Sequence, residues 1–230
     1  MSESNGSASG GADWFARITA ILGLVVALAA VILPYCQSEA DRKENLTIVA
    51  KPEGRGGVIR VSREESQSRT VQMPWIVTLS NTGRTKLSVV SYRIAQLTGT
   101  GGAMFFPGLD GGALDRENKP ISFPLTIDAG ESVSFRLHLG FVPNEEIAKE
   151  LKSMIAAGAP LDPVLTLLSL AEKGVTIYGG KASMHKEAGI IVTIDPSSQQ
   201  QVPIYKLTFQ TGRNQEFSTV ASDYPRPIES

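Results

Sequence analysis

The amino-acid sequence predicts a mainly β protein: an immunoglobulin-like β-sandwich with a two-helix insertion, preceded by one N-terminal transmembrane α-helix. Three observations lead to this prediction. Residues 13–36 form the longest apolar stretch of the chain. Several later segments alternate apolar and polar residues and are bounded by turn residues, as strands are. Two segments between about 143 and 174 combine capping residues with helical apolar spacing.

The apolar stretch has the length and flanks of a membrane span. As a helix, residues 14–35 would rise about 33 Å, close to the roughly 30 Å thickness of a hydrocarbon core. Arg17 is its one charged residue and lies near the start, while Trp14 and Tyr35 mark the two edges, where aromatic rings favour the interface. We therefore expect the lipid bilayer to be the partner of residues 14–35.

Two other roles for this stretch fit less well. A cleaved signal peptide begins with a basic region, whereas residues 1–13 contain no Lys or Arg. A lipoprotein leader has Gly or Ala before its cysteine, whereas Tyr35 precedes Cys36. Cys36 is the only cysteine, so an intramolecular disulfide is excluded, and the sequence leaves open whether this thiol is acylated.

Small residues recur on one face of the predicted span. Thr19, Gly23 and Ala27 are spaced four residues apart, a pattern that lets a second helix approach closely. The alternative is that Gly and Ala are simply common in membrane spans. The stripe is thus a possible helix-packing surface.

The sequence places the protein in a membrane as a single-pass protein, and its style suggests a bacterial inner membrane. Positive charges at 42, 43, 51 and 55 favour a cytoplasmic position for the residues after the span. Sandwich domains behind a single anchor, however, often lie outside the cytoplasm, so the side of the C-terminal domain stays open.

The chain divides into five segments. They are a disordered tail (1–12), the transmembrane helix (13–36), a connector (37–44), the β-sandwich domain (45–210) and a flexible C-terminal tail (211–230).

Two segments predict β-hairpins. In residues 75–94 two alternating runs flank the turn sequence SNTGRT, and in residues 121–141 the turn is DAGE. Val133, Phe135, Leu137, Leu139 and Phe141 form one apolar face of the last strand. Further strands are expected at 45–50, 57–62, 175–178, 189–194 and 203–210.

The helical insertion has explicit start and stop signals. Asn144 can cap a helix that begins at Glu145, and Asp162 can cap a second one that begins at Pro163. Gly174 ends the second helix. Ile147, Leu151 and Ile155 share a face that would pack onto the sheets.

The sequence carries no catalytic, cofactor-binding or metal-binding signature. His138 is expected on the solvent-facing side of its strand, and His185 lies in a polar segment without neighbouring ligands. The acidic residues Asp110, Asp115 and Glu117 lack the spacing of a calcium loop. With a formal net charge of −1, the chain has no general attraction to nucleic acid.

The Gly-rich loop from residue 99 to 112 contains Met104, Phe105 and Phe106. These side chains could form a partner-binding loop, or a short strand within the sandwich.

Together these features favour a membrane-anchored, non-catalytic interaction or assembly module with a protein partner or as a homo-oligomer. The alternatives are a membrane-tethered hydrolase or carbohydrate-active domain, and a small-ligand or glycan sensor that uses loop 99–112.

Overall fold

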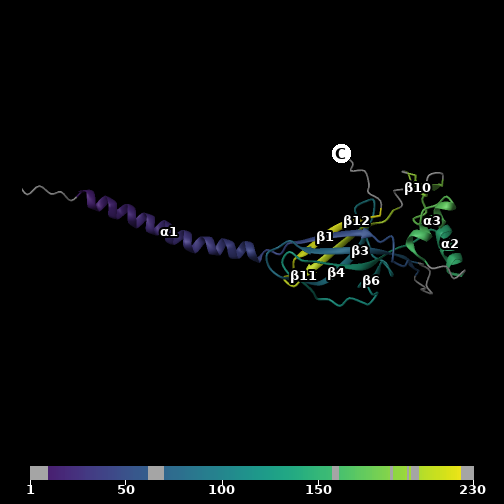
Figure 1. Ribbon diagram of the computed structural model, residues 1–230, viewed down its shortest axis with the longest axis horizontal. Coiled ribbons are helices and arrows are strands. Elements are labelled where there is room, and N and C mark those ends of the chain that lie inside the picture. Colours follow the sequence, from purple (N-terminus) through teal and green to yellow (C-terminus); the bar gives the residue numbers. More distant parts are fainter. Residues whose placement is uncertain are drawn as a thin grey trace, which may run out of the picture.

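A computed structural model (Figure 1) describes residues 10–61, 70–156, 161–186, 189–195, 197 and 202–223; within α1 it leaves out the side chains at 10–13, 15–16 and 33–42. The helices are α1 (Gly10–Arg42), α2 (Glu145–Ala156) and α3 (Pro163–Glu172). The strands are β1 (Leu46–Pro52), β2 (Arg60–Val61), β3 (Val71–Asn81), β4 (Leu87–Leu97), β5 (Ala103–Met104), β6 (Asp110–Leu114), β7 (Leu125–Ile127), β8 (Ser132–Phe141), β9 (Ala182–His185), β10 (Ile191–Ile194), β11 (Ile204–Thr211) and β12 (Glu216–Ser222).

The described chain is mainly β, as predicted, with antiparallel sheets and three helices. One five-stranded sheet has the order β1-β3-β8-β6, with β2 also on β3, and the other has the order β12-β11-β4-β5, with β7 also on β4. Their inner faces contribute to one hydrophobic core. Aromatic contacts join the sheets: the ring centroids are 5.9 Å apart for Trp75 and Tyr205, and 6.3 Å apart for Phe135 and Phe209.

Neither predicted hairpin is correct. β3 and β4, which flank the turn at 82–86, belong to different sheets, and so do β7 and β8, which flank DAGE. Each turn is therefore a β-arch that connects one sheet to the other. The apolar faces of the two strands meet across the core, and the strands find their hydrogen-bonding partners elsewhere in the chain.

Asn81 ties the two arches together. Its side-chain Nδ2 donates to the carbonyl oxygens of Thr85 (2.9 Å) and Ile127 (3.0 Å). Its backbone N–H donates to the carbonyl of Glu131, and its own carbonyl accepts from Gly130. A turn held in this way from both sides fixes the crossing between the sheets.

The predicted helices are confirmed, with one correction. The backbone N–H of Ile147 donates to Asn144 Oδ1 (2.9 Å), and that of Leu165 donates to Asp162 Oδ1 (3.0 Å), so both residues act as caps. Ile147 and Leu151 are buried, but Ile155 is 38% exposed. It is the last residue but one of α2 and lies beyond the part of the helix that packs on the core.

Three predicted boundaries were also wrong. Strand β12 lies inside the expected C-terminal tail, because its edge pairs with β11 from Gln210↔Glu216 to Ile204↔Ser222. Residues 175–178 form a turn closed by the bridge Val175↔Lys181 instead of a strand. Helix α1 continues through the expected connector to Arg42, since no helix-breaking residue follows Pro34 there. The predicted tail at 1–12 lies mostly outside the described residues.

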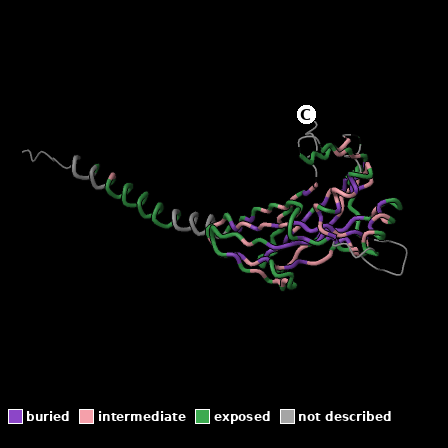
Figure 2. The backbone as a smooth tube through the Cα atoms, turned by 45° about the vertical axis from the view of Figure 1, so that its right-hand side comes forward, coloured by how far each residue is buried: buried purple, intermediate pink, exposed green. Residues whose placement is uncertain are grey.

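Helix α1 projects from one end of the sheets, while α2, α3 and β10 lie at the opposite end (Figure 1). Its described large apolar side chains are exposed except for the half-buried Ile18, and Figure 2 shows this part of the helix as a mostly exposed stretch. Among the residues that the structure describes, no helix reaches the length and apolarity that a membrane crossing needs.

Side-chain and backbone contacts hold the joint between α1 and the sheets. Glu44 is buried and accepts a hydrogen bond from the Thr211 hydroxyl, and its other oxygen lies 3.8 Å from Arg213 Nε. The carbonyl of Asn45 accepts from the backbone N–H of Thr82 (3.0 Å). The chain is thus fixed to two different loops within three residues of the end of α1.

Candidate functional site

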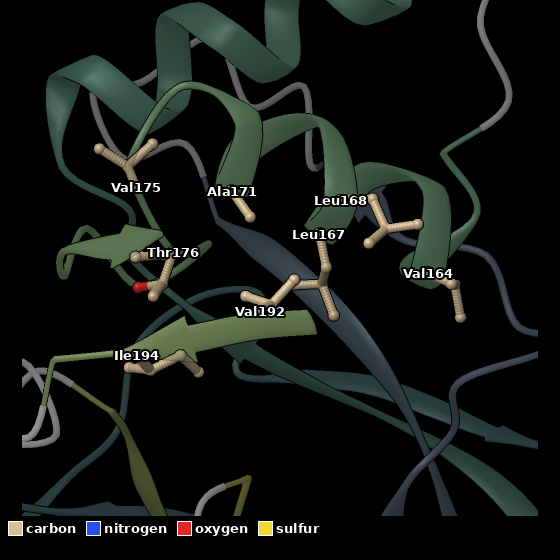
Figure 3. A pocket seen from close by; sticks show the side chains of 9 residues that line it. Val164, Leu167, Leu168, Ala171, Val175, Thr176, Val192 and Ile194 are labelled. Carbon is tan, nitrogen blue, oxygen red and sulfur yellow. The ribbon is translucent and has the colours of Figure 1, made fainter. Parts of the chain in front are cut away.

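An apolar pocket of about 260 Å³ lies between α3 and the two-stranded sheet of β9 and β10 (Figure 3). The pocket is lined by Val164, Leu167, Leu168, Ala171, Val175, Thr176, Ala182, Val192 and Ile194. Figure 3 shows the α3 side chains on one side and those of β10 facing them. It belongs to the end of the molecule that lies farthest from α1 (Figure 1).

The local sequence explains why these side chains converge. Val164, Leu167, Leu168 and Ala171 follow the helical spacing of one face. Val192 and Ile194 are two residues apart on β10 and so share a face of the strand. The pocket therefore arises where one helical stripe meets one strand face.

The chemistry of the pocket wall is almost entirely aliphatic. Its one hydroxyl, on Thr176, accepts a hydrogen bond from the backbone N–H of Gly180 (2.9 Å) and is thereby engaged within the protein. No lining residue is titratable. Such a wall suits an uncharged aliphatic group, whose burial would stabilise a complex by about 25 cal/mol per Å² of apolar surface.

A polar cluster lies beside this pocket, on the outer face of β8. Residues 53–59, between β1 and β2, leave the sheet and cover that face; we call this segment the strap. Glu53 begins the strap and receives hydrogen bonds from Arg136 through both carboxylate oxygens, one of them at 2.7 Å. Arg136 also donates to the carbonyl of Gly56 (3.2 Å) and to Asn118 Oδ1. The hydrogen bond to Glu53, and after it the negative charge of Glu53, raise the pKa of Arg136 above its ordinary value.

The strap also buries His138, which corrects the predicted solvent-facing position. The side chain is only 1% exposed, and its Nε2 lies 3.3 Å from the carbonyl oxygen of Val58. Because a carbonyl can only accept, Nε2 carries the hydrogen of the neutral ring. Nδ1 has no hydrogen-bond partner among the described residues. Burial, followed by the nearby charge of Arg60, lowers the pKa of His138 to about 4.

The strap connects the polar cluster to the apolar pocket. The backbone N–H of Ile59 donates to the carbonyl of Leu161 (2.8 Å), immediately before the cap of α3. At the other end of the strap, a Cβ placed on Gly54 would lie 3.7 Å from Cγ2 of Val164, a pocket residue. The strap thus contacts both the residue that precedes the cap of α3 and the first turn of that helix.

A second depression, of about 330 Å³, brings two carboxylates together. Glu53 and Asp115 line it with Arg116 and Arg136. Glu53 is held by Arg136, and Asp115 Oδ1 accepts from the backbone N–H groups of Glu117 (2.8 Å) and Lys119 (2.9 Å). Both carboxylates therefore take part in hydrogen bonds within the protein.

The other acidic and histidine residues named from the sequence lie apart. Asp110 Oδ1 accepts from the hydroxyl of Tyr92 (3.0 Å) and from the backbone N–H of Gly112 (2.8 Å). His185 is exposed on β9. Within the described ranges, no group of three or more His, Cys, Asp or Glu side chains is arranged to hold a metal ion.

The residues of the predicted partner-binding loop separate in the structure. Met104 and Phe105 are 44% and 70% exposed, whereas Phe106 packs against the hydrophobic core. The alternative prediction of a short strand is correct only for β5, where Met104 pairs with Gln96 at the end of β4. Partner binding by this loop stays a prediction.

The predicted helix-packing stripe lies on α1. Thr19, Gly23 and Ala27 are all exposed there, and their contact with a second helix is likewise still a prediction.

The pocket and the strap have only indirect signals in the sequence. The strap begins within the sequence KPEGRGG (51–57), which is read most simply as a turn between two strands. Glycines at 54, 56 and 57 distinguish it from an ordinary turn, because they allow the chain to pass close over the face of a sheet. A Cβ at Gly57 would lie 2.5 Å from Pro74 Cγ. No protein-family model matches this sequence, and no curated protein matches it.

Proposed function

We propose that this protein is a single-pass membrane-anchored, non-catalytic interaction module that holds an aliphatic group of a protein partner in the pocket between α3 and β10. The pocket itself carries the proposal, because it is an apolar depression without titratable groups at the end of the domain farthest from α1. Anchors of this kind, buried in desolvated pockets, supply most of the free energy of many protein interfaces.

The anchoring part of the proposal concerns residues 14–35. The exposure of Ile21, Leu24 and Val31 on α1 supports it, because a row of large apolar side chains in water would be costly. This stretch includes residues 15, 16 and 33–35, which lie outside the described side chains. We further propose that the two five-stranded sheets form an immunoglobulin-like sandwich, supported by their shared core and by the two arches.

A pair of matched substitutions on α3 tests the pocket. Leu168→Glu places a charge on the pocket wall, and Leu165→Glu places the same charge on the exposed side of the same helix. A photoreactive amino acid at Val192, in the native membrane, should crosslink to one partner peptide that contains an aliphatic residue. We expect Leu168→Glu to reduce the crosslink by at least about tenfold, and Leu165→Glu to leave it unchanged. An equal yield in both variants would exclude the pocket.

A protease experiment tests the anchor and its orientation. After extraction with alkaline carbonate, the protein should stay in the membrane pellet, and release into the supernatant would contradict the anchor. Protease added to spheroplasts then digests the domain if it faces outward, and spares it until lysis if it faces the cytoplasm. The partner should be sought on the side that this experiment identifies.

A further inference from the structure

We infer that the strap Glu53–Ile59 is an acid-sensitive clamp on the apolar pocket, which keeps the first turn of α3 in place while His138 is neutral and releases it when the imidazole gains a proton. The inference concerns the regulation of the pocket and rests on the proposed function. It has two requirements. Contacts must connect the strap to the pocket, and protonation of the imidazole must be unfavourable while the strap is closed.

The connection is made by contacts at both ends of the strap. On the side of β8 the strap is held by the Glu53–Arg136 pair and by the His138 hydrogen bond to Val58. On the side of α3 it is held by the Ile59–Leu161 backbone hydrogen bond. Lifting the strap from β8 therefore removes support from the residues that precede and cap α3.

The surroundings of His138 oppose a positive charge. From its own strand the ring faces Arg136, from β2 it faces Arg60, and from the strap it faces Glu53, whose charge is already shared with Arg136. The strand on one side, β3, contributes the uncharged Gln72 and Pro74, and the segment on the other side contributes Gly111.

Space and hydrogen bonding oppose the charge as well. A Cβ at Gly111 would lie 2.6 Å from His138 Cβ, so the base of the side chain is closely covered, and the residue as a whole is only 1% exposed. A proton on Nδ1 would have no acceptor among the described residues. The cationic ring thus favours a state in which it reaches water, and it reaches water when the strap lifts.

Linkage sets the size of the effect. If the pKa of His138 is about 4 with the strap closed and about 6.5 with the strap open, acid favours the open state. The opening equilibrium at pH 5 is then about 30-fold larger than at pH 8. Most of this change falls between pH 6.5 and pH 5.

Hydrogen exchange of the full-length chain in lipid nanodiscs measures the opening directly. After correction for intrinsic rates, the protection of the Ile59 amide and of the Leu165 amide should fall about 30-fold from pH 8 to pH 5. His138→Gln should abolish the fall. His185→Gln is the matched control, because it removes the other of the two histidines from an exposed position, and it should keep the fall.

Dissolved xenon reports on the pocket without needing the natural partner. We expect xenon to shift the methyl resonances of Val192 and Ile194 at pH 8, and to shift them less at pH 5 in the wild type but not in His138→Gln. Strap opening with an unchanged xenon response and unchanged Leu165 protection would overturn the inference. So would an acid effect that persists in His138→Gln.

Two further measurements keep the outcomes separate. Should His138→Gln fail to fold, the exposed Arg60→Gln removes one of the two cations near the ring, and its acid effect should be smaller than that of the wild type. An equal effect would overturn the inference.

If the photo-crosslink to a partner is absent at every pH, the proposed function fails, while the exchange of Ile59 and Leu165 still decides whether the strap responds to acid.

Discussion

The two faces of β8 are both buried, but by different physical means. The inner face presents Phe135, Leu137 and Leu139 to the shared core, where each is at most 1% exposed. The outer face presents Arg136 and His138 to the strap, where burial depends on hydrogen bonds and on an ion pair. The inner face should therefore be insensitive to pH and the outer face sensitive to it, and substitutions should separate the two.

The largest effect is expected on the inner face. Phe135→Ala removes a ring that contacts Phe123 and Phe209, and should lower the free energy of unfolding by about 3–5 kcal/mol through lost burial and a cavity. Urea denaturation measures it. Phe105→Ala, on a 70% exposed ring, should change it by less than about 0.5 kcal/mol. Similar losses for the two variants would contradict the assignment of Phe135 to the core.

The next effect is expected from breaking the buried ion pair. Arg136→Met leaves the Glu53 carboxylate without its partner, and should cost about 3 kcal/mol. Adding Glu53→Leu should recover much of this loss, because the unpaired charge is then gone. The exposed pair Arg93–Glu216 provides the control: Arg93→Met should cost less than about 1 kcal/mol. Equal costs in the same denaturation series would mean that the strap does not shield Arg136 from water.

The pH dependence of stability should come next in size. The native pKa of His138 lies below the ordinary value, so on acidification the unfolded chain binds its proton first. Stability is thus fully present above about pH 6.5 and falls as the pH drops toward 4, by about 2 kcal/mol at pH 5. Comparing the wild type with His138→Gln at pH 8 and pH 5 isolates this contribution. Parallel losses in the two proteins would assign the acid sensitivity to other groups.

The smallest effect is expected at the uncovered end of the outer face. Ser134 shares a hydrogen bond with Thr78 (2.8 Å) at an exposed position, before the strap begins to cover β8. Ser134→Ala should therefore change the melting temperature by only the equivalent of about 0.5–1 kcal/mol. A loss as large as that of Arg136→Met would show that the strap also covers Ser134.

Features that depend on nearby residues were predictable from the sequence. Asn144 and Asp162 each accept a hydrogen bond from a backbone N–H three residues later, and the alternation at Phe135, Leu137 and Leu139 follows from the strand itself. The choice between a hairpin and a β-arch was not predictable, because both use the same turn residues. It depends on which strand pairs with β3, and those partners, β1 and β8, come from elsewhere in the chain.

The same distinction explains what was missed in the candidate site. The helical stripe of α3 and the alternation of β10 were visible, but not that they face one another across a pocket. His138 was assigned to solvent because its strand neighbours Ser134 and Arg136 are polar. Its actual cover comes from Val58, 80 residues earlier in the chain, and no local pattern reports such a contact.

The fixed joint below the sheets determines how motion can pass along the molecule. With Glu44 and Asn45 bound to separate loops, Lys43 is the one residue between the end of α1 and the first held position. A rotation or tilt of the helix would then move the whole domain with it, and the displacement would be greatest at α3 and β10, which lie farthest from α1. In the other direction, a force exerted by a partner on the pocket would be passed through the contacts of Glu44 and Asn45 to α1.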